Sequence, residues 1–297
     1  MNDKKLNILV TGGNGQLGCC LRDAAKASRN RYIFTDISDV PGMETTLLDV
    51  CNPDTIDIVA DSENVDVIIN CAGYTNVDKA EDETRLADEL NHVAAAHLAA
   101  TAKRRGALLI HISTDYIFGG NATAPIPEDA APAPLGVYGA TKLAGENAVR
   151  SSACSHIILR TAWLYSKYGR NFVKTMFALT ANHPEVKVVN DQVGTPTYAP
   201  NLASFIASIL EGGIPEQRGI FNFTDEGVCS WYDFASEVNS LAGHSCKVMP
   251  CRTADYPTRA KRPHYSVLDK SLVKSTFGVA IPHWTEPLRK CIEELNK

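Results

Sequence analysis

The sequence has 297 residues, of which 44% are hydrophobic and 21% are charged, and its formal net charge is −5. This length and composition are those of a globular chain with one large core, or with one domain and a smaller one. The negative net charge argues against a general nucleic-acid surface.

No apolar run reaches the length of a membrane span, and the N-terminal residues lack the apolar core of a signal peptide. Nine cysteines are scattered along the chain without a C-x-x-C pair, which favours free thiols over disulfides or a zinc site. We therefore expect a cytoplasmic protein that binds neither nucleic acid nor membranes.

Short apolar runs alternate with helical patterns as far as about residue 165, and this alternation predicts a Rossmann-type α/β fold with a doubly wound parallel sheet. Strands are expected at 6–10, 31–36, 47–50, 65–73, 107–115 and 156–161. Helices are expected at 19–25, 53–62, 77–105 and from 137 onward. A loop with four prolines, 119–136, is a candidate wall of the site.

The alternation loosens beyond residue 165. Helices are expected at 172–182, 201–210, 231–241 and 287–295, and strands at 186–191 and 220–223. We expect residues 1–165 to form one domain and residues 166–297 to form mainly a smaller lobe, with the chain crossing back to the first domain. The site would lie in the cleft between them.

The first strand runs into a glycine-rich turn and then into a helix, which is the context of a dinucleotide-binding site. Gly12 permits a tight turn, Gly15 lets the backbone approach a pyrophosphate, and Gly18 lets the helix pack closely on the strand. Gln16 and Leu17 lie in the same turn and are also expected to bind the cofactor, whose pyrophosphate would sit at the N-terminus of the helix that follows. We therefore expect residues 1–165 to form an NAD(P)-binding domain and the smaller lobe to bind mainly the substrate.

Asp36 ends the second strand, 18 residues beyond Gly18. This is close to the spacing of a carboxylate that accepts hydrogen bonds from the adenosine ribose, although it could also be a solvated strand-end residue. A carboxylate there would repel a 2′-phosphate and favour NADH over NADPH. Asp49 and Val50 are expected beside the adenine.

The turn after the fourth strand, with Gly73, Tyr74 and Thr75, is expected to lie along the cofactor, as is Ile112 on the fifth strand. Asn91 falls inside a predicted helix. Such a residue is usually exposed, but it can also hydrogen-bond backbone and hold a kink.

Tyr138 and Lys142 are four residues apart and therefore share a helix face. A tyrosine normally titrates near pH ~10, and a nearby ammonium would stabilise the phenolate and lower its pKa. Lys142 could also bind the nicotinamide ribose, and Thr114 could donate to a substrate carbonyl from the sheet edge. The pair alone is a weak signal, but together with the glycine turn it indicates carbonyl chemistry with a nicotinamide cofactor.

The chain resembles the extended short-chain dehydrogenase/reductases and, within them, the dTDP-4-dehydrorhamnose reductase family. The resemblance covers nearly the whole chain, with matching motifs at 12–18, 70–81, 113–118, 137–146, 160–163, 190–197 and 262–269. The last two motifs lie outside the cofactor half, so the match is more specific than a shared nicotinamide-binding fold.

The resemblance implies reduction of the 4-keto group of dTDP-4-dehydro-L-rhamnose by NADPH or NADH, giving dTDP-L-rhamnose. Tyr138 would be the general acid, Lys142 would hold the ribose and tune Tyr138, and Thr114 would bind the same C4 oxygen. Asp115 and Trp163 would contact the deoxysugar.

The resemblance implies three further features. Arg160 and Arg262 could meet the nucleotide diphosphate, although arginines more often serve ion pairs. Tyr116 stands where sugar-nucleotide dehydratases carry a glutamate, which favours reduction over dehydration. Relatives form magnesium-bridged dimers, so a homodimer and Mg²⁺ come into consideration, but no acidic cluster maps onto 293–294.

Two other functions stay open. One is reduction of another nucleotide-linked 4-keto-deoxysugar, because the base and the sugar are bound by loops that follow no simple code. The other is a non-catalytic, nucleotide-binding regulatory subunit like that of methionine adenosyltransferase, which resembles the same family. The intact Thr114, Tyr138 and Lys142 argue for the enzyme.

Overall fold

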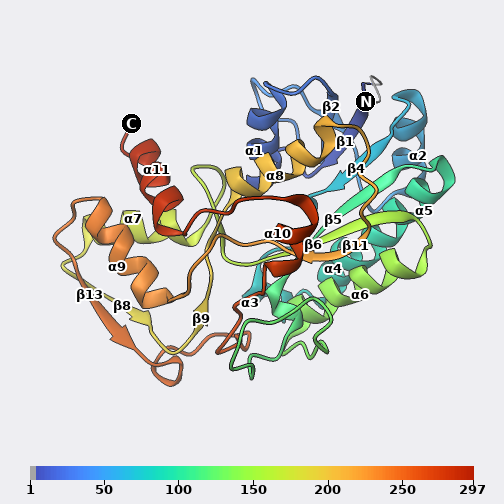
Figure 1. The fold of residues 1–297 in the computed structure, drawn as a ribbon. Helices are drawn as coiled ribbons and strands as arrows, with labels where there is room; N and C mark the ends of the chain where they lie inside the picture. Colours follow the sequence, from blue (N-terminus) through green and yellow to red (C-terminus); the bar gives the residue numbers. More distant parts are fainter. Residues whose placement is uncertain (1–4) are drawn as a thin grey trace.

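A seven-stranded parallel sheet lies at the centre of the computed structural model, which describes residues 5–297 (Figure 1). Its strand order is β11-β6-β5-β4-β1-β2-β3. The strands are β1 (Asn7–Thr11), β2 (Arg31–Asp36), β3 (Thr46–Leu47), β4 (Val67–Asn70), β5 (Leu108–Thr114), β6 (Ser155–Thr161) and β11 (Gly219–Asn222). The order from β3 to β6 is that of a doubly wound dinucleotide-binding sheet, so the predicted fold class is confirmed.

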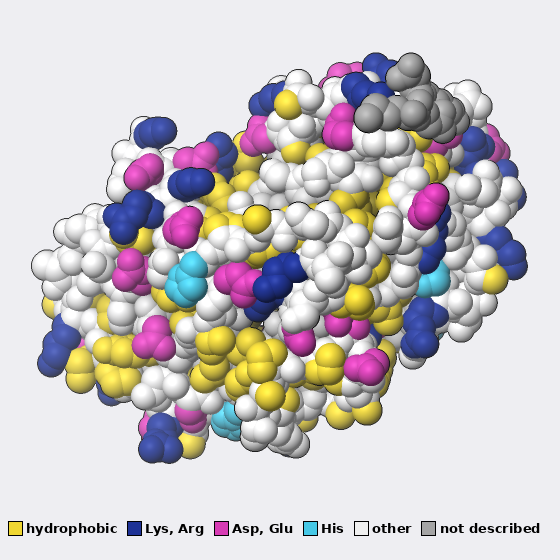
Figure 2. All heavy atoms as spheres, viewed as in Figure 1, with side chains coloured by type: hydrophobic (Ala, Val, Ile, Leu, Met, Phe, Trp, Pro, Cys, Tyr) yellow, Lys and Arg dark blue, Asp and Glu magenta, His cyan; other side chains and the backbone are white. Residues whose placement is uncertain are grey.

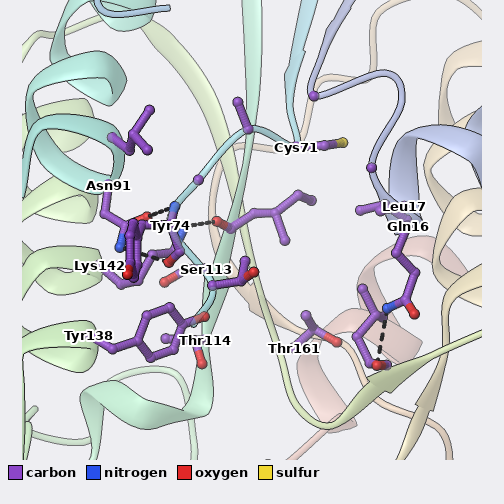
Figure 3. A pocket seen from close by; sticks show the side chains of 18 of the residues that line it. Gln16, Leu17, Cys71, Tyr74, Asn91, Ser113, Thr114, Tyr138, Lys142 and Thr161 are labelled. Carbon is purple, nitrogen blue, oxygen red and sulfur yellow. Dashed lines mark hydrogen bonds between the residues drawn. The ribbon is translucent and has the colours of Figure 1, made fainter. Parts of the chain in front are cut away.

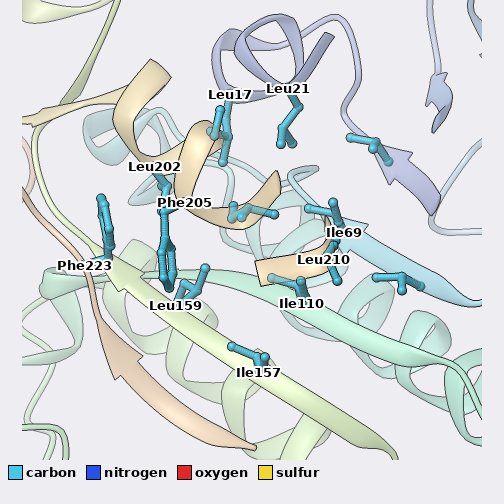
Figure 4. Packing of buried hydrophobic residues seen from close by; sticks show 14 of the residues in the cluster. Leu17, Leu21, Ile69, Ile110, Ile157, Leu159, Leu202, Phe205, Leu210 and Phe223 are labelled. Carbon is cyan, nitrogen blue, oxygen red and sulfur yellow. The ribbon is translucent and has the colours of Figure 1, made fainter. Parts of the chain in front are cut away.

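Helices cover both faces of this sheet (Figure 1). One face carries α1 (Gln16–Ala25) and α8 (Ala199–Glu211), and the other carries α2 (Pro53–Ser62), α5 (Ala94–Arg105) and α6 (Val137–Ser151). The central strands are apolar on both sides because neither face meets water. Figure 4 shows Leu21 and Phe205 from the two helices of the first face packed over Ile69 and Ile110 of the sheet.

The second half of the chain contributes to this layer as well. β11 pairs with β6 in parallel, with Gly219 opposite Ile157, and α8 packs on α1. The short helix α10 (Ser271–Phe277) packs on β11. The sheet is therefore completed by residues far from the dinucleotide-binding motif in sequence.

The remaining residues form a smaller lobe around an aromatic core. Its elements are β7 (Leu164–Tyr165), α7 (Phe172–Asn182), β8 (Glu185–Val189), β9 (Val193–Gly194), β10 (Thr197–Tyr198), β12 (Cys229–Ser230), α9 (Trp231–Leu241), β13 (Lys247–Cys251), η3 (Thr253–Asp255) and α11 (Thr285–Leu295). β8 and β13 form a two-stranded parallel sheet, and the other strands pair in twos. Phe234 lies at the core centre, with Tyr165, Phe172 and Trp284 around it.

The third strand is shorter than predicted. β3 ends at Leu47, and the N–H of Leu48 then donates to the carbonyl of Asp36 while the Leu48 side chain turns into the core. Asn52 caps α2 directly afterwards. The apolar pattern over 47–50 therefore reflects burial of single side chains rather than a strand.

The single helix predicted over 77–105 is wrong. The segment consists of α3 (Val77–Ala80), α4 (Thr84–Asp88), the π-helix η1 (Glu89–Val93) and α5. Acidic residues at the break bind other parts of the chain, because Glu81 accepts from the N–H of Val137 and Asp82 pairs with Arg259. Tertiary contacts thus override helix propensity here.

Charged residues are interspersed over the surface. On the face in Figure 2, basic and acidic side chains alternate, and neither sign covers a continuous area. No helix within residues 5–297 is long and apolar enough to cross a membrane. All nine cysteines lie within the described residues, and none is joined to another in a disulfide.

The close approach of α1 to the glycine turn gives a stability prediction. A Cβ at Gly18 would lie 2.6 Å from Cα of Gly13, so we expect Gly18→Ala to lower the free energy of unfolding by about 1–3 kcal/mol. Urea denaturation measures this loss. Gly212→Ala is the control, because nothing lies within 4 Å of its added methyl. Equal stability of the two variants would contradict the packing role of Gly18.

Candidate active site

A cavity of about 570 Å³ runs along the carboxyl edge of the sheet, where open α/β sheets bind ligands. It reaches from the glycine turn past the ends of β4 and β5 to the smaller lobe (Figure 3). The predicted site residues that line it are Gly12, Gly15, Gln16, Leu17, Asp36, Val50, Gly73, Tyr74, Thr75, Ile112, Thr114, Asp115, Tyr138, Lys142 and Trp163.

Two predicted cofactor residues do not line this cavity. Gly18 lies beneath the turn, where it allows α1 to approach Gly13. The carboxylate of Asp49 accepts from the N–H of Cys51, whereas the neighbouring Leu48 and Val50 do line the cavity.

The glycine turn forms a cradle whose shape fits a pyrophosphate. Gly12 has a φ of +63°, and a Cβ there would lie 2.8 Å from the N atom of Ala72. Gly15 is the N-cap of α1, and no side chain caps the helix. The first N–H groups of α1 are therefore left for an anion. Asp36 lies at the other end of the turn and accepts from the N–H of Asn14 over 3.0 Å.

Asn91 holds the next wall of the cavity in place. It lies in the π-helix, and its amide binds both backbone groups of Tyr74, with Oδ1 accepting over 2.9 Å and Nδ2 donating over 3.1 Å. The same Nδ2 donates to the hydroxyl of Thr141, which lies between the two catalytic candidates in the sequence of α6. The extra residue of a π-helix thus turns an internal amide onto a neighbouring loop.

Tyr138 and Lys142 face the cavity from the first two turns of α6, and Thr114 faces them from the end of β5 (Figure 3). Lys142 is buried, and its Nζ donates to the carbonyl oxygen of Ile112 over 2.6 Å. The structure therefore brings together the three residues that the sequence singled out for chemistry.

Burial dominates the protonation of this group. It raises the pKa of Tyr138 to about 12, while the neighbouring Thr114 hydroxyl lowers that pKa and Asp115 raises it further. Burial also lowers the pKa of Lys142 to about 8, against the attraction of the Glu146 carboxylate. The pKa of Tyr138 is therefore raised rather than lowered as expected, because burial is the dominant cause of the shift.

Asp115 is buried beside Thr114. The Thr114 hydroxyl donates to Oδ1 of Asp115 over 3.0 Å and accepts from the N–H of Tyr116 over 3.2 Å. Burial raises the pKa of Asp115 to about 6. The carboxyl group can therefore exchange a proton close to neutral pH, at the floor of the cavity.

The prediction that Arg160 meets the nucleotide diphosphate is wrong. Its guanidinium forms a bidentate pair with the buried carboxylate of Glu146, at 2.9 and 2.8 Å, and its third nitrogen donates to the carbonyl of Glu128. Arg262 lies outside the cavity lining and pairs with Asp78 at 2.7 Å. Neither arginine is unpaired, in keeping with the commoner role of arginines.

Two aromatic rings form the wall from the smaller lobe. Trp163 has a φ of +49°, an unusual conformation for a bulky residue, and its ring stacks on Trp231 with centroids 3.5 Å apart. Trp231 also lines the cavity, but the sequence analysis did not predict it as a site residue. A tryptophan at the start of an amphipathic helix is more commonly a core residue. Arg170 was missed as well, since it follows no recognised motif.

A metal centre has no counterpart in the described part of the chain. No group of three or more His, Cys, Asp or Glu residues between 5 and 297 could hold a metal ion. Glu294, at the C-terminal acidic pair, instead pairs with Lys167 and accepts from the hydroxyl of Tyr198.

Comparisons with known proteins identify the family of this chain. The RmlD substrate binding domain family matches residues 6–297. The chain is 36% identical to dTDP-4-dehydrorhamnose reductase of Escherichia coli (strain K12), covering 98% of both chains. A dTDP-4-dehydrorhamnose reductase structure from Clostridium acetobutylicum is 41% identical, with a TM-score of 0.91 over 98% of this chain and all of that one.

A second solved structure, of dTDP-4-dehydrorhamnose reductase from Bacillus anthracis in complex with NADP, is 34% identical. Its TM-score is 0.88 over 98% of this chain and all of that one. Family and fold thus agree along nearly the whole chain: this protein belongs to the RmlD substrate binding domain family, among the dTDP-4-dehydrorhamnose reductases.

Proposed function

We propose that this protein reduces the 4-keto group of dTDP-4-dehydro-L-rhamnose to give dTDP-L-rhamnose, using NADPH or NADH. The observation that carries the proposal is the meeting of Thr114, Tyr138 and Lys142 in one cavity with the glycine cradle. A binding protein would need the cradle but not a phenol, a hydroxyl and an ammonium around one point. The substrate is supported by the similarity to dTDP-4-dehydrorhamnose reductases.

We also propose a division of labour along the chain. Residues 1–165 would hold the cofactor, with its pyrophosphate on Gly12, Gly15 and the start of α1 and its adenosine near Asp36. Residues 166–297 would mainly bind the nucleotide sugar, with Trp163 and Trp231 beside the deoxysugar. The aromatic faces suit a sugar because they offer a flat apolar surface that needs no hydrogen-bond partner.

The reaction needs a hydride at C4 and a proton at the C4 oxygen, and the nicotinamide cofactor supplies the hydride when it is bound. Tyr138 supplies the proton, since a phenol with a pKa near 12 stays protonated at neutral pH and gives up its proton as negative charge develops on the oxygen. Lys142 is held by the Ile112 carbonyl and has two further hydrogens for the ribose and the phenol.

Thr114 would orient the substrate carbonyl. A hydroxyl has one hydrogen, and in the structure Asp115 accepts it. Engaging the substrate therefore requires this hydrogen to turn from Asp115 to the C4 oxygen. Asp115 is then free to contact a sugar hydroxyl.

We also propose a cellular compartment for the protein. Nine free thiols support a reducing compartment such as the cytoplasm. A homodimer and a role for Mg²⁺ stay predictions.

The first test combines activity with removal of the acid. Purified protein with dTDP-4-dehydro-L-rhamnose made in situ should oxidise NADPH or NADH and form dTDP-L-rhamnose. Tyr138→Phe should lower kcat by roughly 10²–10⁴-fold while cofactor affinity changes little, because only the proton donor is lost. Tyr232→Phe, outside the cavity, is the control. A folded, cofactor-binding wild type that turns over no substrate would refute this substrate, and a fully active Tyr138→Phe would refute the acid.

The pH dependence of the rate tests Lys142. Its pKa of about 8 means that the ammonium loses its charge as pH rises through this value, so we expect kcat/KM to fall above pH 8. In Lys142→Arg the side chain stays charged throughout, so the alkaline fall should disappear even if the maximal rate is lower. A pH–rate profile of both proteins makes the comparison. The same alkaline fall in the variant would assign it to another group.

Asp36 should set the preference between the two cofactors. Its carboxylate lies at the adenosine end of the cavity and would repel a 2′-phosphate. We expect Asp36→Ala to raise the ratio of kcat/KM for NADPH to that for NADH by about tenfold, a change of about 1.4 kcal/mol. Initial rates with each cofactor measure the ratio. An unchanged ratio would show that the 2′-position lies elsewhere.

A further inference from the structure

The proposed ligands of the cavity carry several negative charges, but few of the side chains that line it are positively charged. Of its lining residues in the described chain, the acids are Asp36 and Asp115 and the cations are Lys142 and Arg170. Lys142 is buried at the catalytic end and is held by the Ile112 carbonyl. Arg170 is therefore the remaining cation available to a phosphate group in the cavity.

Arg170 is exposed, and no hydrogen bond or ion pair joins it to another residue within 5–297. The lysines near it are engaged, because Lys167 pairs with Glu294 and Lys174 donates to the carbonyl of Lys167. An unpaired guanidinium at the wall of a ligand cavity is suited to a phosphate, which matches its planar array of donors.

The backbone on both sides of Arg170 is fixed against the cofactor cradle. Gly169 has a φ of +62°, and a Cβ there would lie 3.4 Å from Cβ of Gln16. Asn171 caps α7, and its Nδ2 donates to Gln16 Oε1 over 2.8 Å and to the carbonyls of Ser166 and Tyr168. Arg170 therefore stands on a rigid base next to the first residue of α1.

We propose that Arg170 is a diphosphate-binding residue of this cavity, set to pair with the pyrophosphate of the dinucleotide cofactor. This inference rests on the proposed function, because it takes the glycine cradle as the cofactor site. The contact of its neighbours with Gln16 places Arg170 beside the pyrophosphate end of the cradle. Asp36, at the end of β2, marks the opposite, adenosine end.

If Arg170 binds the diphosphate, its removal should weaken the binding of NADH and NADPH equally. NADH and NADPH share the diphosphate and differ only in the 2′-phosphate, so Arg170→Ala should weaken both by a similar factor, on the order of tenfold. Arg170→Lys should recover part of the loss, since it keeps the charge but not the two-pronged donor geometry. The loss should shrink at high salt, because ions screen an exposed charge.

The experiment measures dissociation constants of NADH and NADPH by titration calorimetry, without nucleotide sugar, at two salt concentrations. Wild type, Arg170→Ala, Arg170→Lys and Arg289→Ala are compared; Arg289 is an exposed arginine of α11 outside the cavity and serves as the matched control. Melting temperatures confirm folding. A second arm measures KM for the keto sugar at saturating cofactor.

Weaker binding of both cofactors in Arg170→Ala, with the control unchanged, would support the proposal. A rise confined to the KM of the sugar would support the same diphosphate chemistry with the nucleotide sugar as its source. Loss of NADPH alone, or no loss in either arm, would overturn it while leaving the proposed function intact. A wild type that binds neither cofactor would instead refute the proposed function itself.

Discussion

The arrangement of the site depends on one buried ion pair, between Glu146 of α6 and Arg160 of β6. Both residues are almost fully buried, and the pair is bidentate. The Ser113 hydroxyl also donates to Glu146, and the Glu128 carbonyl accepts from Arg160. Four segments that are separate in the sequence therefore meet at one point. Removing one partner of such a pair costs about 3–5 kcal/mol, because the other charge is left buried without compensation.

This pair fixes α6, the helix that carries the proposed catalytic residues Tyr138 and Lys142. Glu146 lies one turn after Lys142 and two turns after Tyr138, on the same side of α6. The adjoining contacts of α6 are made by glycines, since a Cβ at Gly139 or Gly145 would collide with neighbouring backbone. Glycine surfaces permit close approach but offer no side chains to fix the position along the axis. The directional bonds of Glu146 supply that position.

The same charge affects the protonation of the site. Burial disfavours the charged form of both Lys142 and Tyr138, so it lowers the first pKa and raises the second. The Glu146 carboxylate opposes the shift of Lys142, and the lysine keeps a pKa of about 8. At neutral pH the site therefore holds an ammonium and a neutral phenol. That is the protonation needed to donate a proton to a ketone oxygen, whereas the reverse oxidation would start from the phenolate.

The sequence predicted what depends on local spacing. The glycine turn joins two consecutive elements, Asp36 ends the next strand, and Tyr138 and Lys142 share one helix, so short-range spacing suffices to place them. Arg160 was misassigned because the sequence around an arginine at a strand end does not show what the arginine binds. It can bind a ligand, or it can pair with a carboxylate such as that of Glu146, fourteen residues earlier. The stacking of Trp231 on Trp163 depends on how α9 packs within the smaller lobe, and no local sequence pattern determines this packing.

Gln16 shows why the two parts of the site act as one. It belongs to the cofactor cradle, yet both ends of its side-chain amide bind the other side of the cleft: Nε2 donates to the carbonyl of Leu164, and Oε1 accepts from Asn171. Leu164 follows Trp163, and Asn171 caps α7 of the smaller lobe. A shift of the lobe would break both bonds, and each is worth about 1 kcal/mol. Hydride transfer demands that nicotinamide and ketone be held within contact distance. By bonding both Leu164 and Asn171, Gln16 would keep the proposed cofactor and substrate sides of the cavity at a fixed distance.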